Sequence, residues 1–372
     1  MKIIKQKKSF LKNVRPTINE IAKYVPGEYT ANSKNKKVIK LSSNESPFEI
    51  PSGLKNLISN QLIYSFRYPD GDSNLLKEAI ARKFSINKKQ IVCGNGSDDI
   101  LSLISQAFTP SGSEIICSKN GFIFYPVIAQ AAGAKIVYAD TINLNISLEN
   151  ILKKISKKTK VIFFANPNNP SGSLLFKKEI IRFLKKVPTD IIVVLDGAYA
   201  EYVTDEKYTD GIELVKSFKN LIITRTFSKI YALAGFRVGW AYSSLEIIEI
   251  LEKIRGPFNV NLIAQIAAAK ILHNRKFIQK SIDHNFTWRN WLQKELERLN
   301  LRTYNSFGNF LLVKNNSDYI STEKIVSELK KNNILVRFLK NYGLNNFFRV
   351  SIGLEVELKI FIRKLRIILR KN

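Results

Sequence analysis

The chain is poor in cysteine and histidine. Among its 372 residues there are two cysteines, Cys93 and Cys117, and two histidines, His273 and His284. Two cysteines without metal-ligand spacing are too few for a disulfide scaffold in a chain of this size, and they favour a reducing, cytoplasmic location. Two histidines exclude a three-histidine zinc site, and a Ser-His-Asp triad would need a nucleophile elbow that the sequence does not offer. We expect structural or exposed histidines and no metal.

Long apolar runs are also missing. Residues 1–16 carry basic side chains but no apolar run of signal-peptide length. No later segment reaches the roughly 18 apolar residues that cross a bilayer. Because hydrophobic residues make up 45% of the chain and charged residues 24%, the composition is that of an ordinary globular protein. We therefore expect a folded, soluble protein without a membrane partner.

Acidic residues are in deficit. The chain has 31 Asp and Glu against 59 Lys and Arg, a formal net charge of +28. Such a charge attracts anionic small molecules and polyanions at low salt, so a nucleic-acid-binding protein is one interpretation. Lysine is scattered through nearly every surface segment, however, and no Arg-rich tail, zinc-finger spacing or aromatic RNA-binding motif organises it. We favour a compositional bias and expect no nucleic-acid partner.

Short apolar runs alternate with amphipathic segments of helical length from about residue 90 to 245. The runs at 91–94, 114–118 and 190–195 are rich in β-branched residues and are separated by helical lengths of chain. This pattern predicts an α/β fold with a mostly parallel sheet between helices. Since ligands of such sheets sit beyond the carboxyl ends of the strands, chemistry is expected in the turns that follow them.

The character of the chain changes after about residue 268. A long helical stretch at 275–300 is followed by shorter strand and helix patterns, which predicts a smaller α+β domain. The final predicted helix has one apolar face, formed by Leu354, Leu358, Phe361, Ile362, Leu365, Ile368 and Leu369. We expect this face to dock on the smaller domain; a helix lying on a membrane surface is the alternative.

Three turns after predicted strands carry polar groups. Asp196 ends a very apolar strand, where a carboxylate is costly unless it meets a cation or a strong donor. The sequence NPNNPSG at 166–172 predicts an irregular turn that exposes amide side chains. Residues 94–98, GNGSD, precede a helix whose free N–H groups can hold a phosphate, although an ordinary capped helix start has the same sequence.

The fourth turn, TFSKIYALAGFRVG at 226–239, is the most specific. Lys229 follows a strand end directly, and an amine in a partly desolvated pocket loses proton affinity and can act as a nucleophile. Thr226 and Ser228 supply hydroxyl groups beside it, and Arg237 supplies a fixed cation for a phosphate. A lone lysine would favour a surface position, whereas this combination predicts a site.

The order of these motifs resembles that of the fold-type I, pyridoxal phosphate dependent aminotransferases. It runs from NPNNPSG through DGAY at 196–199 to TFSK and AGFRVG. Within that class, YVPG at 24–27, LSSNESP at 41–47, ILVR at 334–337 and RVSIG at 349–353 are similar to stretches of the histidinol-phosphate aminotransferase family. The resemblance thus extends over nearly the whole chain.

The resemblance implies two domains and a homodimer. The large cofactor-binding domain would span 41–268 and hold a mostly parallel, seven-stranded-type sheet between helices. The small α+β domain would span 269–372, and residues 1–40 would form an N-terminal arm that contributes to it.

The resemblance also implies pyridoxal 5′-phosphate as the cofactor. Lys229 would bind the cofactor aldehyde covalently, Asp196 would pair with the ring nitrogen, and Asn169 and Tyr199 would hydrogen-bond the ring oxygen. Lys229, Asp196 and Tyr199 are therefore the implied catalytic residues.

The remaining cofactor contacts are implied in the same way. Phe122 would stack on the ring, with Phe124 and Tyr125 as rival candidates. The phosphate would lie among residues of one subunit and one tyrosine of the other, namely Ser97, Asp98, Thr226, Ser228, Arg237 and the partner subunit's Tyr68.

The implied reaction is an amino transfer of histidine biosynthesis. It interconverts histidinol phosphate plus 2-oxoglutarate and imidazole acetol phosphate plus glutamate. Arg349 would clamp the substrate carboxylate, a bidentate role that favours Arg over Lys. Arg337, with Asn44 and the partner subunit's Tyr24, would hold the phosphate of histidinol phosphate. A surface ion pair is the alternative for Arg337.

Other functions fit the same central motifs. An aromatic amino-acid aminotransferase or a threonine-phosphate decarboxylase would keep the same lysine and aspartate, and a nucleic-acid-binding protein on an inactive enzyme scaffold is a more remote alternative. Two single positions depart from the family pattern: Gly197 stands where many relatives have Glu, and Ser171 where many have Thr. Neither has an implied catalytic role. Two stretches near the expected substrate end, SPFEIPSG at 46–53 and IGLEVE at 352–357, are also less typical of the family.

Overall fold

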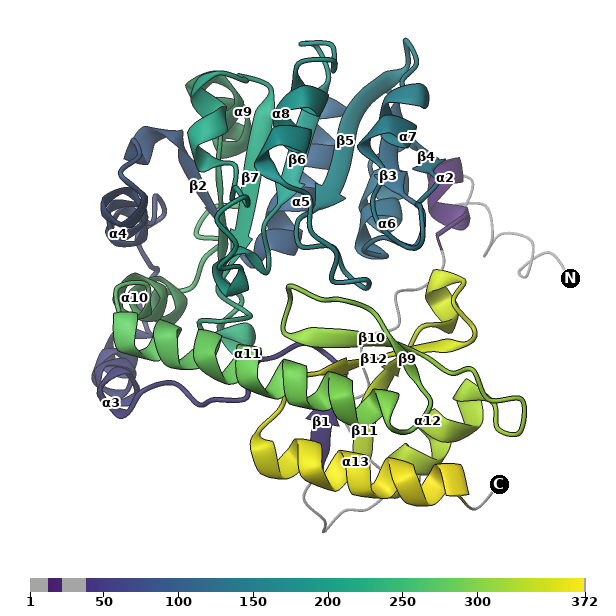
Figure 1. Cartoon of the computed structure of the whole chain (residues 1–372). Coiled ribbons are helices and arrows are strands. Elements are labelled where there is room, and N and C mark those ends of the chain that lie inside the picture. The colour runs from purple at the N-terminus through teal and green to yellow at the C-terminus, as the bar shows by residue number, and fades with distance from the viewer. Residues whose placement is uncertain (1–12, 22–37, 371–372) are drawn as a thin grey trace, which may run out of the picture.

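The computed structural model describes residues 13–21 and 38–370, which are arranged around two β-sheets (Figure 1). The seven-stranded sheet has the order β2-β8-β7-β6-β5-β3-β4. Its strands are β2 (Ile91–Gly94), β3 (Glu114–Ser118), β4 (Lys135–Ala139), β5 (Thr159–Ala165), β6 (Ile192–Asp196), β7 (Leu221–Thr226) and β8 (Gly239–Tyr242). Strands β3 to β7 pair in parallel, whereas β8 is antiparallel to both of its neighbours. The predicted mostly parallel sheet is confirmed.

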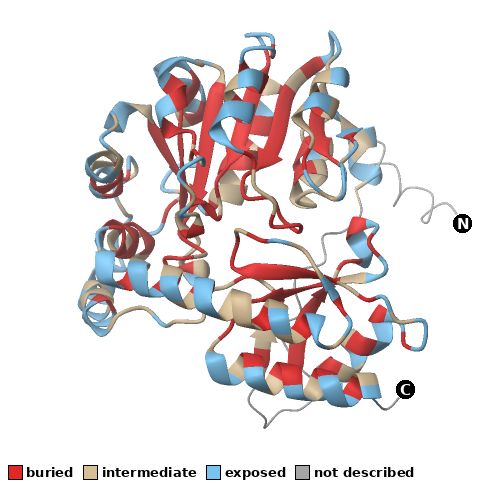
Figure 2. Cartoon of the chain, viewed as in Figure 1, coloured by how far each residue is buried: buried red, intermediate tan, exposed pale blue. Residues whose placement is uncertain are grey.

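Both faces of this sheet are covered by helices, which explains why the central strand β6 is apolar from Ile192 to Leu195. Along β6, Val193 and Leu195 face one core, and Ile192 and Val194 face the other. Helices α4, α7, α8 and α10 contribute to the first core and α5, α6 and α9 to the second. Figure 2 shows the central strands as buried, between helices that are exposed on their outer sides.

The helices around the large sheet are mostly short. The α-helices are α3 (Ser52–Gln61), α4 (Asn74–Phe84), α5 (Ser97–Phe108), α6 (Phe124–Ala131), α7 (Leu148–Lys153), α8 (Lys177–Leu184), α9 (Leu245–Ile254) and α10 (Leu262–Ile271). The 3₁₀-helices are η2 (Leu62–Tyr64), η3 (Lys88–Gln90), η4 (Ala200–Tyr202), η5 (Ile212–Lys216) and η6 (Ala234–Phe236). The short helix α2 (Pro16–Asn19) packs on α6.

The second sheet has five strands in the order β1-β11-β12-β10-β9. They are β1 (Ile39–Leu41), β9 (Arg302–Thr303), β10 (Phe310–Lys314), β11 (Ile334–Phe338) and β12 (Phe347–Ser351). The sheet is antiparallel except that β1, from the N-terminal part of the chain, pairs in parallel with β11. Residues just before 41 therefore do contribute a strand to the smaller sheet.

Three helices pack on the small sheet, and a 3₁₀-helix follows β11. The three helices are α11 (Arg275–Glu297), α12 (Thr322–Lys331) and α13 (Glu355–Arg370), and the 3₁₀-helix is η7 (Lys340–Tyr342). In α13, the apolar side chains Leu358, Phe361 and Leu365 are buried in the core of the small sheet, as the sequence predicts. No helix in the described part of the chain is long and apolar enough to cross a membrane.

The boundary predicted at residue 268 falls inside α10. Buried side chains on both sides of that position, Ala267 and Ile271, belong to the core of the large sheet, and so does Phe277 at the start of α11. The remainder of α11 contributes Leu292 and Leu296 to the core of the small sheet. Helix α11 thus connects the two cores.

Candidate active site

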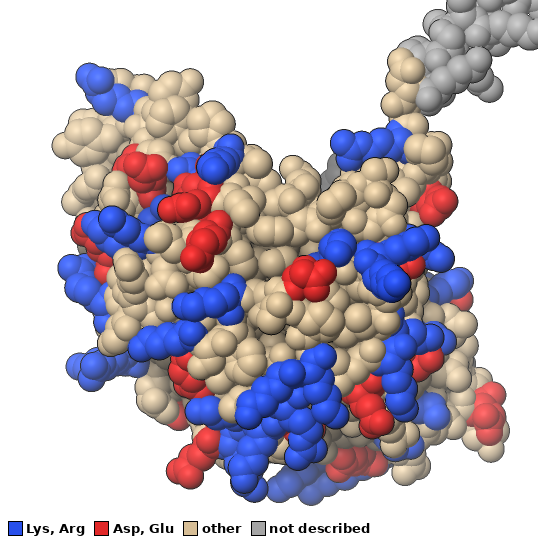
Figure 3. All heavy atoms as spheres, turned by 90° about the horizontal axis from the view of Figure 1, so that it is seen from above, with Lys and Arg blue, Asp and Glu red and all other residues tan. Residues whose placement is uncertain are grey.

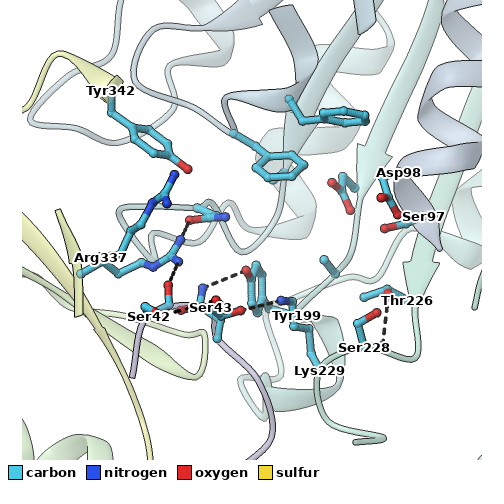
Figure 4. Close-up of a pocket in the computed structure, with 18 of the residues that line it drawn as sticks. Ser42, Ser43, Ser97, Asp98, Tyr199, Thr226, Ser228, Lys229, Arg337 and Tyr342 are labelled. Atoms are coloured by element: carbon cyan, nitrogen blue, oxygen red, sulfur yellow. Dashed lines mark hydrogen bonds between the residues drawn. The ribbon is translucent and has the colours of Figure 1, made fainter. Parts of the chain in front are cut away.

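A cavity of about 360 Å³ lies beyond the carboxyl ends of β5, β6 and β7, where the two sheets face each other (Figure 4). The large-domain residues that line it are Ser97, Asp98, Phe122, Phe124, Ala165, Asn169, Asp196, Ala198, Tyr199, Thr226, Ser228, Lys229 and Arg237. The segment Ser42, Ser43 and Asn44, together with Arg337, Tyr342 and Arg349, closes the other side. The predicted strand-end turns therefore meet in one place.

Asp196 lies at the floor of the cavity as the last residue of β6. Its side chain is only 4% exposed, and burial raises the pKa of its carboxyl group. Two hydroxyl groups act in the opposite direction: Tyr125 Oη donates to Oδ2 at 2.9 Å, and Thr224 Oγ1 donates to Oδ1 at 3.2 Å. A cation at the free edge of this carboxylate would favour its charged form.

Lys229 follows β7 and also lines the cavity. Its Nζ donates a hydrogen bond to the Ser43 carbonyl at 3.1 Å and lies 5.9 Å from the centre of the Tyr199 ring. Burial, and next the positive charge of Arg349, lower the pKa of Lys229 to about 8. About a tenth of the amine is therefore neutral and nucleophilic at pH 7, far more than for an ordinary lysine.

Arg237 and Gly96 form a cradle at one end of the cavity. Arg237 donates to Ser228 Oγ at 3.1 Å and forms an ion pair with Asp98 at 2.7 Å. Gly96 has φ +94°, and a Cβ added there would lie 2.2 Å from Asp98 Oδ1 and 2.3 Å from Arg237 Nη2. The positive φ favours glycine, and a larger residue would displace the Asp98 carboxylate or the Arg237 guanidinium group.

Donors for an anion converge on this cradle. Helix α5 starts at Ser97 and is 12 residues long, so its first N–H groups lack intrahelical acceptors. Thr226 and Ser228 add hydroxyl groups from the turn after β7, and the Ser228 N–H donates to Thr226 Oγ1 at 3.1 Å. A helix N-terminus, hydroxyl groups and a guanidinium group suit a phosphate.

Tyr199 and Asn44 meet in the middle of the cavity wall. Asn44 Nδ2 donates to Tyr199 Oη at 3.0 Å, and Asn44 Oδ1 accepts from Ser351 Oγ at 2.9 Å. Burial raises the pKa of Tyr199 to about 12, so its phenol stays protonated at neutral pH. Asn44, expected at the substrate, is thus in direct contact with an expected cofactor ligand.

Arg349 on β12 is buried and points toward Asn169. It donates to Asn169 Oδ1 and, at 2.9 Å, to the Ser42 carbonyl. Its Nε has no hydrogen-bond partner among the described residues. Because its guanidinium group lines the cavity and can donate parallel hydrogen bonds, Arg349 suits a carboxylate ligand.

Arg337 on β11 is 9% exposed and lines the cavity, so it is not a surface residue. Figure 4 shows it beside Tyr342 of η7, at the end of the cavity away from Lys229. Asn120 Nδ2, in the loop before α6, donates to the Tyr342 carbonyl at 2.6 Å and so joins the two sides of the cavity there.

The aromatic wall contains two of the three rival ring-stacking candidates. Phe122 and Phe124 both line the cavity, with ring centres 6.1 Å apart. Tyr125 lies behind them and is not a lining residue, because its ring stacks on Phe163 at 5.1 Å. The geometry therefore keeps Phe122 and Phe124 as candidates for contact with a ligand ring.

Among the described residues, one expected site residue, Tyr68, does not line this cavity. Tyr68 is 81% exposed and stacks on Phe258 with 4.6 Å between ring centres. Tyr24 lies outside the described residues. Both were expected to act in the site of the partner subunit, and that expectation stays a prediction.

Sequence reasoning missed four groups that matter here: the Ser43 carbonyl, Thr224, Tyr342 and the hydroxyl group of Tyr125. Thr224 had a visible signal, since it stands two residues before Thr226 in the same strand and therefore faces the same side. The Ser43 carbonyl and the Tyr125 hydroxyl group had none, because their partners, Lys229 and Asp196, are 186 and 71 residues away.

A lysine with a lowered pKa, a buried carboxylate and a phosphate cradle at the ends of parallel strands define an enzyme of the fold-type I transferase class. The model of the family "Aminotransferase class I and II" matches residues 36–365. The chain belongs to this family.

Its relatives by sequence include histidinol-phosphate aminotransferases. The protein of that name from Rhodopseudomonas palustris (strain BisB18) is 39% identical over 341 residues, which cover 91% of this chain and 93% of the relative. Histidinol-phosphate aminotransferase 2 from Pasteurella multocida (strain Pm70) is 40% identical over 332 residues, covering 89% and 90%.

Two solved structures are similar in fold. The histidinol-phosphate aminotransferase from Clostridium acetobutylicum has a TM-score of 0.83 and 27% identity, covering 90% of this chain and 100% of that one. The one from Sinorhizobium meliloti, in complex with pyridoxal-5′-phosphate, has a TM-score of 0.90 at 24% identity, covering 96% and 98%. The expected fold-type I architecture is confirmed.

Proposed function

We propose that this protein transfers an amino group reversibly between glutamate and imidazole acetol phosphate, giving 2-oxoglutarate and histidinol phosphate, with pyridoxal 5′-phosphate as its cofactor. One observation carries the proposal: a single cavity holds Lys229, Asp196 and the Arg237 cradle together with the two buried arginines Arg337 and Arg349. Relatives named for this reaction support the choice of substrate.

The residues present fit the cofactor. The cradle that a Cβ at Gly96 would fill suits its phosphate, and the buried carboxylate of Asp196 suits a protonated ring nitrogen. Asn169 and Tyr199 would hold the ring oxygen, and Lys229 would hold the aldehyde end. When bound, pyridoxal phosphate supplies an aldehyde that takes up the amino group and a ring that withdraws electrons from the substrate α-carbon.

Lys229 would carry the proton in the reaction. With its pKa lowered to about 8 by burial and by Arg349, the amine can take a proton from the substrate α-carbon and return one as its conjugate acid. Asp196 would remain ionised and would fix the orientation of the cofactor ring. No described group of three or more His, Cys, Asp or Glu residues could hold a metal ion.

The two arginines would bind the acidic groups of the substrates. Arg349, which lines the cavity, would bind the carboxylate of glutamate. Arg337 would bind the phosphate of histidinol phosphate, and Figure 4 shows it at the opposite end of the cavity from Ser97 and Asp98.

A homodimer is part of the proposal. The segment after α3 exposes several large apolar side chains, namely Leu62, Ile63, Tyr64, Phe66 and Tyr68, and Phe258 is exposed beside them. Such a patch on a globular protein indicates an interface. A second copy bound there would bury these side chains and bring Tyr68 toward the partner's phosphate cradle. Sedimentation equilibrium of the purified protein tests this, and a strictly monomeric protein would contradict it.

The net charge of +28 does not require a nucleic-acid partner. In the view of Figure 3, Lys and Arg side chains gather most densely at the bottom of the molecule, and acidic side chains lie among them elsewhere. Every proposed substrate is an anion, so the charge would raise its local concentration at low salt. We propose a cytoplasmic location, since both cysteines are buried free thiols.

An assay of the purified, cofactor-loaded protein tests which substrate it prefers. We expect glutamate-dependent conversion of imidazole acetol phosphate to be faster than that of phenylpyruvate, and we expect no release of carbon dioxide from threonine phosphate. A preference for phenylpyruvate would favour an aromatic amino-acid aminotransferase instead. Decarboxylation of threonine phosphate would favour a threonine-phosphate decarboxylase.

A further inference from the structure

Each carboxylate oxygen of Asp196 accepts a hydrogen bond from a buried hydroxyl group. Tyr125 Oη donates to Oδ2 at 2.9 Å, and Thr224 Oγ1 donates to Oδ1 at 3.2 Å. The two donors come from different elements, since Tyr125 is in α6 and Thr224 is in β7. They therefore fix the plane of the carboxylate from two directions.

Tyr125 is held rigidly. Its side chain is 2% exposed, and its ring stacks on Phe163 of β5 at 5.1 Å and meets the edge of Phe122 at 5.4 Å. Burial, and next the charge of Asp196, raise the pKa of Tyr125 well above its ordinary value, so the phenol remains a donor. A fixed, protonated phenol can only donate to this carboxylate.

We propose that Tyr125 is a positioning residue that holds the carboxylate of Asp196 ionised and oriented toward the cavity. The inference rests on the proposed function, in which that carboxylate pairs with the ring nitrogen of the cofactor. Tyr125 does not line the cavity, so it acts through Asp196 and touches neither cofactor nor substrate. A hydroxyl donor stabilises the negative charge that burial alone would disfavour.

The variant Tyr125→Phe tests this in the cofactor-loaded enzyme. It removes the hydroxyl group and keeps the ring that packs on Phe163, so we expect the fold to be retained. A hydrogen bond to a charged group is lost, so kcat should fall roughly tenfold to a hundredfold, with KM for glutamate changed less than about threefold. The dissociation constant of the cofactor, measured by equilibrium dialysis with absorbance detection, should rise roughly tenfold.

A double-mutant cycle with Asp196→Asn separates positioning from a merely structural role. If Tyr125 acts through the carboxylate, adding Tyr125→Phe to Asp196→Asn should change the cofactor dissociation constant less than about twofold. If the tyrosine hydroxyl group merely supports the packing, Tyr125→Phe should raise the cofactor dissociation constant by the same factor in the wild type and in Asp196→Asn. That result would overturn the proposal.

Tyr231→Phe is the matched control. Tyr231 is also 2% exposed, and its hydroxyl group also donates to a carboxylate, Glu201, at 3.4 Å, away from the cavity. We expect wild-type cofactor affinity and kcat for this variant. If Tyr231→Phe lost as much cofactor affinity and kcat as Tyr125→Phe does, the effect of Tyr125→Phe would be due to general destabilisation. That result would overturn the proposal.

Failure of the inference can be told apart from failure of the proposed function. Wild-type protein that takes up no pyridoxal phosphate would overturn both. Wild-type protein that binds the cofactor, with a Tyr125→Phe variant of unchanged affinity and kcat, would overturn only the inference. Should Tyr125→Phe not fold, Thr224→Val removes the donor on the other oxygen, and unchanged cofactor affinity in that variant would equally count against it.

Discussion

Arg337 and Arg349 stand directly opposite each other on the neighbouring antiparallel strands β11 and β12, and both line the same cavity. Like charges at opposite positions of a sheet repel each other, and here both side chains are buried. The hydrogen bonds from Arg349 to Asn169 and to the Ser42 carbonyl offset part of this cost. The pair gives this end of the cavity a positive potential that anionic ligands would neutralise.

The two arginines are expected to serve different substrates. Arg349→Ala should raise KM for glutamate roughly tenfold to a hundredfold, because a charge-assisted hydrogen-bonded pair is lost. Arg337→Ala should raise KM for histidinol phosphate by a similar factor and leave the glutamate half-reaction within about threefold of wild type. Single-turnover absorbance changes of the two half-reactions measure this. Equal losses in both half-reactions for Arg337→Ala would contradict the division of labour.

Lys229→Ala should abolish turnover. It removes the only described lysine that lines the cavity, and the shift of cofactor absorbance on mixing should be lost while sedimentation remains that of the wild type. Lys186→Ala, at an exposed position after α8, is the control and should behave as the wild type does. Full activity in Lys229→Ala would remove the basis of the proposed chemistry.

The reaction of cofactor-free protein with pyridoxal phosphate should depend on pH through Lys229. The neutral amine is the nucleophile, and the pKa of Lys229 is lowered from 10.5 to about 8. The rate should therefore increase about tenfold per pH unit below pH 8 and level off above it. Stopped-flow absorbance between pH 6.5 and 9.5 measures the profile. A rate that still rises steeply at pH 9.5 would indicate a lysine with an ordinary pKa.

The cradle at Gly96 should be sensitive to a single methyl group. Gly96→Ala places a Cβ within 2.3 Å of Asp98 and Arg237, so cofactor affinity should fall more than about tenfold. Gly112→Ala is the matched control, because Gly112 also has a positive φ, +80°, but has no atom within 4 Å of the added Cβ. Both variants should lose stability by about 1 kcal/mol through backbone strain, which urea unfolding measures. Equal cofactor affinity in the two would contradict the assignment of the phosphate site.

Local sequence predicted the groups that follow strands. Lys229 and Asp196 end or follow adjacent parallel strands, so the rule that such turns share one edge of the sheet brings them together. The sequence also predicted the apolar face of α13, because the 3.6-residue period of its apolar residues does not depend on what the helix packs on.

Contacts between distant segments were not predictable in the same way. The hydrogen bond from Arg349 to Asn169 joins residues 180 positions apart, and that from Asn44 to Tyr199 spans 155 positions. Each depends on how the small sheet is set against the large one, which no local pattern specifies. The backbone of Asn44 is also left-handed, with φ 54°. Asparagine tolerates this conformation, but its presence in a sequence does not predict it.

The parallel pairing of β1 with β11 has a consequence for how the chain matures. The paired residues Ile39 and Ile334 are 334 − 39 = 295 positions apart, so the small sheet cannot be completed until residue 334 has left the ribosome. Long-range pairings of this kind are made slowly, after local elements have formed. Asp196 and Lys229 thus leave the ribosome before Arg337 and Arg349, and a nascent chain contains its lysine and aspartate before it can form the side of the cavity that would bind acidic substrates.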